Sequence, residues 1–168
     1  MRLILALENI RFTHNVGSLL RTSLGFDLDG VVTIGITPHP RIKDDPRLPH
    51  IINRAEKQIE KTALGGEKLF THHFEDAVAL IEWATNEGLQ PVSIELDKGA
   101  TPIKNYVPHN DCLLIVGNEI TGVSDILLNA SSAILEIPIS VAKESYNVSV
   151  AGAIAIYELH AQFGKLKA

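Results

Sequence analysis

The stretch EIPISVAKESYNVSVAGAIAIYE, from Glu136 to Glu158, decides the fold that we expect of this 168-residue chain. It begins as an apolar strand, breaks at Pro138, passes through a polar turn and re-enters as a long helix of small residues from about Asn147. Packing of the strand and the helix does not require Ser145 and Asn147 at the mouth of that helix. Because a helix N-terminus presents free N–H groups and a partial positive charge, the turn predicts a site for a small polar ligand.

Apolar runs alternate with helix-like segments along the rest of the chain. The expected strands are residues 2–7, 30–36, 68–72, 91–96, 111–116 and 133–137, and the expected helices are residues 15–24, 51–64, 74–86, 124–129 and 147–163. Several strands are unbroken apolar runs, which is typical of sheets covered on both faces. The pattern predicts an α/β fold in one domain, residues 1–168, with a mostly parallel sheet and helices on both faces.

Three polar constellations follow predicted strands, at Leu96–Asp97, at Gly117–Glu119 and in the turn after Ile137. Ligands of parallel sheets bind beyond the carboxyl ends of the strands. In the run LLIVGNEITGVS (113–124), glycine lets a ligand approach the backbone, and Glu119 can pair with an arginine. An ordinary strand-to-helix loop with a solvated acid explains this run equally well.

The first helix carries a candidate anion site. We expect Asn15 to cap this helix and Arg21, four residues after Gly17, to lie over that glycine. An arginine fork above a capped helix N-terminus suits a phosphate group. Taken alone, an ordinary surface arginine is the simpler interpretation.

Composition favours a cytoplasmic protein. The single cysteine, Cys112, lies in an apolar run and cannot build a disulfide framework. The N-terminal residues lack a signal-peptide cleavage pattern, and no apolar run approaches the roughly 20 residues that span a membrane. The histidines are scattered and do not make a zinc set with one cysteine, so no metal is expected.

The formal net charge is −5, whereas nucleic-acid-binding domains are usually basic. Contact with nucleic acid would therefore need a local patch. A basic patch is possible in residues 39–61, which contain Arg41, Lys43, Arg47, Arg54, Lys57 and Lys61. On charge alone, a solvated loop and helix face is at least as good an interpretation.

Taken together and in this order, three stretches resemble the SpoU family of RNA ribose methyltransferases, within the SPOUT superfamily. They are residues 15–22, 114–123 and 137–151, and residues 61–66 (KTALGG) also resemble that family. The resemblance implies a SPOUT fold with a deep C-terminal trefoil knot, which no general rule would predict because knots are nearly absent from proteins. It also implies a homodimer, here without a separate RNA-binding extension.

The reaction implied by the resemblance is methyl transfer from S-adenosylmethionine to a ribose 2′-hydroxyl of tRNA or rRNA. The donor is already activated by its sulfonium, so catalysis rests on in-line positioning and on the handling of one proton. Arg21 matches the catalytic arginine of the family. Since arginine stays protonated, its implied role is to bind the adjacent phosphate and to polarise the hydroxyl.

The resemblance assigns further residues by position. The other residues implied to be catalytic are Asn15, Glu119, Ser145 and Asn147. The implied cofactor contacts are Leu96, Gly117, Asn118, Ile137, Tyr146, Asn147 and Val148. The expected RNA contacts are Arg21, Arg41, Lys43 and Arg47.

Two alternatives remain open. Tyr146 stands where the family usually has leucine, and with the acidic charge it motivates an RNA-binding or assembly protein of the same fold with little or no methyltransferase activity. That alternative predicts RNA binding that does not respond to the cofactor. A small α/β enzyme acting on a free nucleotide is the third hypothesis, and the lack of a phosphate-cradling glycine loop counts against it.

Overall fold

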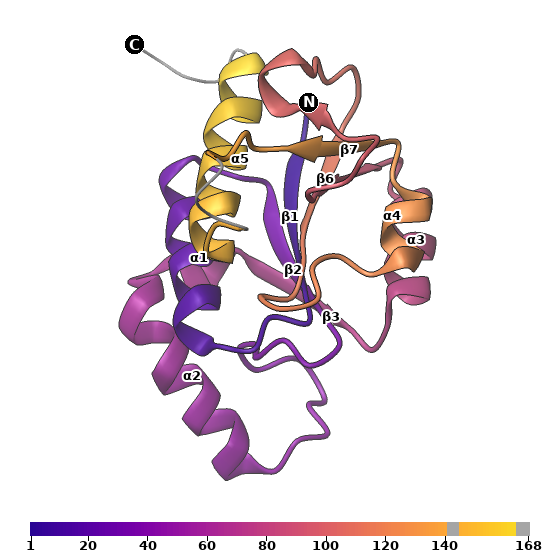
Figure 1. Ribbon diagram of the computed structural model, residues 1–168. Helices are drawn as coiled ribbons and strands as arrows, with labels where there is room; N and C mark the ends of the chain where they lie inside the picture. The colour runs from indigo at the N-terminus through magenta and orange to yellow at the C-terminus, as the bar shows by residue number, and fades with distance from the viewer. Residues whose placement is uncertain (141–144, 164–168) are drawn as a thin grey trace.

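A parallel sheet forms the centre of the molecule. The computed structural model describes residues 1–140 and 145–163. Seven strands lie in the order β3-β2-β1-β6-β4-β7-β5, and each pair of neighbours runs parallel (Figure 1). The strands are β1 (Leu3–Glu8), β2 (Gly30–Ile34), β3 (Phe70–Phe74), β4 (Gln90–Ile94), β5 (Thr101–Pro102), β6 (Cys112–Val116) and β7 (Ala133–Glu136). The prediction of a mostly parallel α/β sheet is confirmed.

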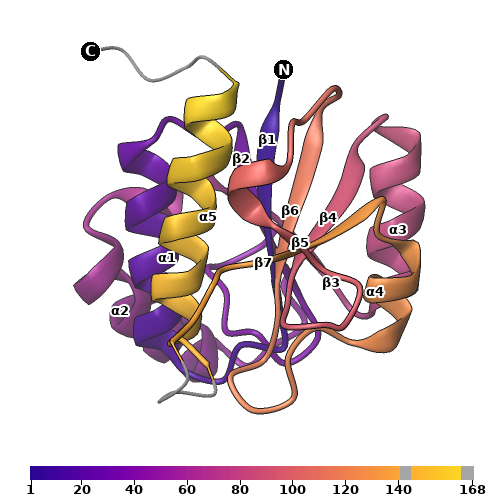
Figure 2. The same cartoon turned by 45° about the horizontal axis from the view of Figure 1, so that its top comes forward.

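Helices cover both faces of the sheet, as predicted. In Figure 2, α1 and α5 lie on one face with α2 outside α1, while α3 and α4 lie on the other face. The helices are α1 (Thr13–Gly25), α2 (Pro49–Ala63), α3 (Ala77–Asn86), α4 (Asp125–Ala130) and α5 (Val148–Gln162), with short 3-10 turns η1 (Gly66–Leu69) and η2 (Ile103–Asn105).

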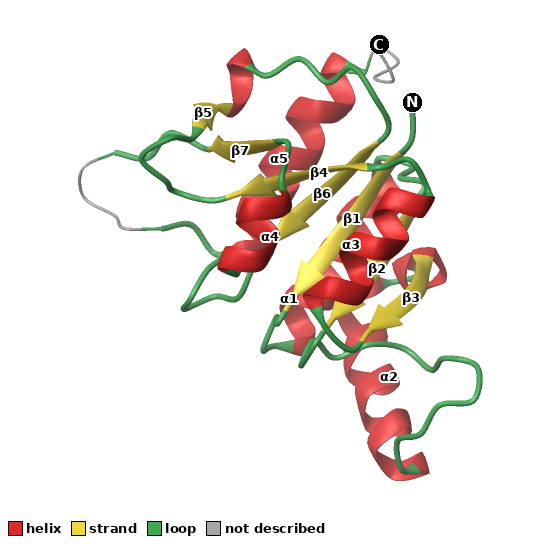
Figure 3. Ribbon diagram, turned by 90° about the vertical axis from the view of Figure 1, so that its right-hand side faces the viewer, coloured by secondary structure: helices red, strands yellow, loops and turns green. Residues whose placement is uncertain are grey.

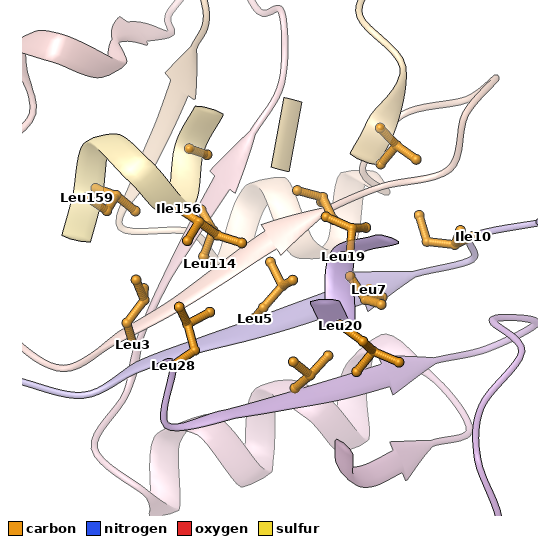
Figure 4. Close-up of a cluster of buried hydrophobic side chains, with 14 of the residues drawn as sticks. Leu3, Leu5, Leu7, Ile10, Leu19, Leu20, Leu28, Leu114, Ile156 and Leu159 are labelled. Atoms are coloured by element: carbon orange, nitrogen blue, oxygen red, sulfur yellow. The ribbon is translucent and has the colours of Figure 1, made fainter. Parts of the chain in front are cut away.

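The two faces of β1 explain why it is an unbroken apolar run. Side chains alternate across a strand, so Leu3, Leu5 and Leu7 enter one hydrophobic cluster while Ile4 and Ala6 enter another. Helices α1 and α5 contribute to the first cluster, and α3 and α4 to the second. Figure 4 shows the first cluster, in which β1 packs against Leu19, Leu20, Ile156 and Leu159.

Helix α1 packs so closely against α2 and against η1 that a glycine is required at each contact. A Cβ at Gly17 would lie 2.7 Å from the carbonyl oxygen of Ile59 and would collide with the hydroxyl of Thr62. A Cβ at Gly66 would lie 2.7 Å from the amide nitrogen of Arg21. The glycine of the first motif therefore serves helix packing. The predicted placement of Arg21 over Gly17 is wrong, because α2 occupies that space.

Several predicted elements exist with shifted ends. The strand expected at residues 68–72 is β3, after η1, and the helix expected from residue 74 begins at Ala77. Asp76 fixes that start by accepting a hydrogen bond from the Ala79 amide at 2.9 Å. Val78, on the apolar stripe of that segment, is 52% exposed. The sequence predicts a loop where β5 lies, because a strand of only two residues is too short to show an alternating pattern.

The predicted knot concerns the chain between β7 and α5. Residues 141–144 of this connection lie outside the described residues. The knot therefore stays a prediction, implied by the family.

The loop between β2 and α2 contains a buried histidine. The ring of His39 stacks on that of His73 in β3, with centroids 3.9 Å apart, and its Nδ1 donates to the Pro40 carbonyl at 2.8 Å. Burial, assisted by the neighbouring His73, lowers the pKa of His39 from 6.5 to about 4. Burial also lowers the pKa of His73. Both rings are therefore neutral in the folded protein at neutral pH.

We expect the protein to lose stability as the pH falls from 6.5 towards 4. Below pH 6.5, His39 is protonated in the unfolded chain, whereas in the native state it stays neutral until the pH approaches about 4. The unfolded state therefore binds more protons in this window. The shift corresponds to about 3 kcal/mol in the free energy of unfolding. Urea unfolding at about pH 7.5 and about pH 4.5 measures the loss. The variant His39→Phe keeps a ring against His73, and its free energy of unfolding should fall less between the two pH values. An equal fall in the variant and in the unaltered protein would contradict the assignment to His39.

Candidate active site

A chain of hydrogen bonds joins the three motifs at one end of the sheet. Glu119, in the loop after β6, accepts a hydrogen bond from the side-chain amide of Asn15 in α1 at 2.8 Å. The side-chain oxygen of Asn15 accepts one from the side-chain amide of Asn147 at 3.3 Å, although the two asparagines are 132 positions apart. Three of the residues predicted to be catalytic are thereby brought together.

Asn15 does not cap α1, so that prediction is wrong. The helix begins at Thr13, and Phe12 holds the capping position without a side-chain hydrogen bond. Asn15 instead lies in the first turn, with only 2% of its surface exposed. A buried amide needs partners inside the protein, and Glu119 and Asn147 provide them.

Asn147 lies at the mouth of α5, as predicted. Its side-chain oxygen accepts hydrogen bonds from the backbone amide and the hydroxyl of Ser149, at 2.9 and 2.6 Å. The side-chain nitrogen of Asn147 donates to the side-chain oxygen of Asn15. Asn147 therefore both caps α5 and joins this helix to α1. Ser145 and Tyr146 precede it on the surface, and the Tyr146 hydroxyl donates to the Pro138 carbonyl at 3.2 Å.

Glu119 is an ionised group with fixed orientation. Partial burial opposes its ionisation, but hydrogen bonds from the backbone amide of Arg11, at 3.0 Å, and from Asn15 outweigh this effect and lower its pKa. Both carboxylate oxygens thus have a partner. At neutral pH the site therefore contains a fixed acceptor and negative charge, which has no proton to give.

A cleft opens beside this network, with about 750 Å³ of empty space that includes its open mouth. Its walls come from the ends of β4 and β6, the loop after β6 and the start of α5 (Figure 3). Most residues that the family resemblance assigns to the cofactor line it: Leu96, Gly117, Asn118, Ile137, Tyr146 and Val148. Glu119 and Ser145 also line the cleft, whereas Asn147 does not.

Asn118 shapes the loop after β6. Its side-chain amide donates to the Asn9 carbonyl at 2.7 Å, and its side-chain oxygen accepts the amide of Ile120 at 2.8 Å. Its backbone pairs with Gly122 through two hydrogen bonds of 3.0 Å. The side chain and the backbone of Asn118 are therefore both used within the protein, and they fix the shape of the loop that lines the cleft.

Sequence reasoning missed Glu95, which lines the cleft directly after β4. One carboxylate oxygen accepts the Val123 amide at 2.8 Å and the other accepts the Leu96 amide at 2.9 Å. The carboxylate also lies against Gly122, whose φ of +72° and lack of a side chain permit the approach. Glu95 thus clamps two loops that form the cleft. The available signal is an acid at the carboxyl end of a strand beside a predicted ligand loop.

Three of the predicted RNA contacts, Arg41, Lys43 and Arg47, lie in the loop before α2, and the last two differ in how free their charges are. The Arg47 guanidinium pairs with Asp45 at 2.6 Å and donates to the carbonyls of His39 and Pro40, at 3.1 and 3.2 Å. This guanidinium holds the pKa of Asp45 well below its usual range. The Arg47 guanidinium therefore stabilises the loop, and its charge is already paired within the protein. Lys43, by contrast, is exposed.

Of the other two predicted contacts, Arg41 lies in the same loop and Arg21 lies on α1. Arg41 donates to the side chain of Asn53 at 3.0 Å and pairs with Glu56 at 3.5 Å. Arg21 is exposed on α1, six residues beyond Asn15 and so about 9 Å further along the helix. Arg21 does not line the cleft. The single chain therefore separates this arginine from the cleft that it is expected to serve.

The described residues contain neither a metal centre nor a membrane span. Within residues 1–140 and 145–163, no group of three or more His, Cys, Asp or Glu side chains is placed to hold a metal ion. In the same part of the chain, no helix is long and apolar enough to cross a membrane.

Fold and site together define a class. A parallel α/β sheet, with the loops after β4 and β6 and the segment before α5 meeting around one cleft, defines the chain as an α/β protein with a ligand site at the carboxyl ends of its strands. The chain belongs to the SpoU rRNA Methylase family, whose model matches residues 2–157.

Known proteins of this family are similar along nearly the whole chain. It is 28% identical over 156 residues to the 23S rRNA (adenosine(1067)-2′-O)-methyltransferase of Streptomyces azureus, covering 92% of this chain and 53% of that protein. It is 27% identical over 161 residues to the tRNA (guanosine(18)-2′-O)-methyltransferase of Aquifex aeolicus, covering 95% and 69%. The chain thus spans about half the length of the first of these relatives.

A solved structure supports the fold. The chain superposes on the AdoMet-bound rRNA methyltransferase from Sinorhizobium meliloti with a TM-score of 0.79 at 20% sequence identity. The match covers 95% of this chain and 56% of that one. At this identity the likeness shows the fold.

Proposed function

We propose that this protein is an S-adenosylmethionine-dependent methyltransferase that methylates a ribose 2′-hydroxyl of tRNA or rRNA in the cytoplasm. The observation that supports this proposal most is the hydrogen-bond network that joins Asn15, Glu119 and Asn147 beside a cleft. Membership of the SpoU family and the names of its relatives, which are 2′-O-methyltransferases of rRNA and tRNA, support the same reaction.

The cleft suits the cofactor. Val116, Ile137 and Val148 provide apolar walls for a flat adenine ring, and Gly117 lines the cleft directly after β6. The residues that would hold the cofactor are those of the predicted set that line the cleft, Leu96, Gly117, Asn118, Ile137, Tyr146 and Val148. When bound, S-adenosylmethionine would supply a methyl group on a positively charged sulfur.

The chain's own residues must orient the hydroxyl and handle its proton. Glu119 is ionised and fixed, so it suits a role as acceptor and as an orienting group for Asn15. Arg21, which stays protonated, suits the phosphate next to the reacting ribose. These roles are positional and electrostatic, in keeping with a donor that is already activated.

We include a homodimer in this proposal. Among the described residues that line the cleft, none is lysine or arginine, and Arg21 lies about 9 Å further along α1 than Asn15. A second copy, or the RNA itself, would have to bring cation and cleft together. Light scattering should give twice the chain mass at micromolar concentration. The mass of a single chain under these conditions would remove this part of the proposal.

Titration calorimetry with S-adenosylmethionine and with its demethylated product tests the cofactor assignment. We expect both to bind, because the apolar walls of the cleft suit the adenosine they share. If neither binds while RNA still does, the protein is an RNA-binding member of the family without the activity.

We expect Glu95→Gln to weaken cofactor affinity by about tenfold, since glutamine has one acceptor oxygen and must break one of the two hydrogen bonds of the clamp. Glu8→Gln is the matched control. Glu8 accepts the Ser124 amide of the same loop at 2.9 Å but is not among the residues that line the cleft. Calorimetry should show near-normal affinity for Glu8→Gln, and equal weakening in both variants would show a general effect on the loop instead.

A further inference from the structure

We propose that the outward face of α2 is a docking surface for the phosphate backbone of the RNA substrate. This inference rests on the proposed function, because it names the surface by which a substrate of that class is held. It goes beyond the cleft, which α2 does not line.

Four basic positions of α2 form one stripe. His50, Arg54, Lys57 and Lys61 recur at intervals of four, three and four residues, so at 100° per residue they fall within about 60° of arc. All four are exposed. From first to last they extend along about 16 Å of helix. We call His50, Arg54, Lys57 and Lys61 the α2 stripe.

The opposite face of α2 fixes the direction of this stripe. Ile52, Ile59 and Ala63 are the buried residues of the helix, and they share the side that packs on α1. The close contact of Gly17 with Thr62 lies on the same side. The α2 stripe therefore points away from the body of the protein, where its charges have not been used for packing.

Nearby acids only partly offset the stripe. Glu56 accepts the backbone amide of Arg41 at 3.1 Å and pairs with its guanidinium, so its charge is turned to the preceding loop. Residues 37–68 hold seven Lys and Arg against five Asp and Glu, whereas the rest of the chain holds eight against fifteen. A polyanion that approaches this acidic protein is therefore attracted by the segment around α2 and repelled on average elsewhere.

The position of α2 suits a long ligand. Figures 1 and 3 show α2 projecting beyond the sheet at the end to which the strands point, the end at which the loop after β6 also lies. No residue of α2 is among those that line the cleft. An RNA that places one ribose at the cleft can extend towards α2, and evenly spaced cations along a helix suit a phosphate backbone better than a folded acidic protein.

The test is RNA affinity as a function of salt. The probe is an unmodified transcribed tRNA, and the variant is Arg54→Gln/Lys57→Gln/Lys61→Gln, because glutamine keeps helix propensity without charge. At 0.1 M salt, we expect affinity to fall on the order of 30-fold, and the slope of log K against log salt to flatten by about 2. Lys57→Gln alone should weaken binding by several-fold, whereas Lys104→Gln, an exposed lysine of η2, should not.

Controls separate this inference from the proposed function. The affinity of the triple variant for S-adenosylmethionine, measured by calorimetry, should equal that of the unaltered protein. Such a result would show that the fold of the variant is intact. A variant with Lys57 and Lys61 replaced by arginine and Arg54 by lysine should bind like the unaltered protein, because it keeps the charge. If the unaltered protein transfers methyl groups while the triple variant keeps its affinity and salt slope, the α2 surface is overturned and the function stands.

Discussion

Arg21→Ala is expected to lower the rate of methyl transfer to RNA by about 10³-fold, the size of effect that proton handling and charge stabilisation supply. Arg21 is exposed on α1 and lies outside the cleft, so its loss should leave the affinity for S-adenosylmethionine unchanged. Single-turnover transfer of a labelled methyl group, together with calorimetry of cofactor binding, measures the two quantities separately.

Arg21→Lys provides the matched control. Lysine keeps the positive charge but lacks the planar fork that grips a phosphate through two hydrogen bonds. We expect it to retain part of the activity, above the level of Arg21→Ala. Equal transfer by Arg21→Ala and the unaltered protein would remove Arg21 from its assigned role.

Gly117→Ala is expected to reduce cofactor affinity by at least about 100-fold, since displacing loop backbone costs several kcal/mol. A Cβ on Gly117 would collide with the backbone of Gly122 and Val123. Relief of that collision must move the loop after β6, which carries Glu119 and forms one wall of the cleft. Calorimetry with S-adenosylmethionine measures the loss.

Gly99→Ala controls for the change from glycine to alanine. Gly99 lies in an exposed loop, and a Cβ there would meet only the Asp97 carboxylate at an ordinary contact distance of 3.5 Å. Its cofactor affinity should remain close to that of the unaltered protein. Undiminished affinity in Gly117→Ala would mean that the cofactor does not depend on this loop.

Sequence reasoning predicted the parts of the site that follow from local pattern. The apolar run before Gly117 identifies a strand buried on both faces, and the polar groups after it lie at the carboxyl end of the sheet. Asn147 precedes a long run of small apolar residues, so its place at the mouth of α5 follows from helix rules. These features depend on neighbours in the sequence.

The features that sequence reasoning missed depend on distant partners. The helix start at Thr13 is set by the backbone at Phe12, so Asn15 is free to bond Asn147, far along the chain. The role of Gly17 depends on Thr62, which only the folded chain brings against it. The clamp by Glu95 uses backbone amides, which leave no mark on residue type.

The central claim is transfer of a methyl group to a ribose 2′-hydroxyl. The most direct measurement is incubation of the protein with S-adenosylmethionine carrying a labelled methyl group and with unmodified tRNA and rRNA transcripts, followed by alkaline hydrolysis. A 2′-O-methyl group blocks cleavage of the adjacent phosphodiester, so our account predicts label in alkali-resistant dinucleotides. Label found only in mononucleotides, or no label despite bound cofactor, would contradict it.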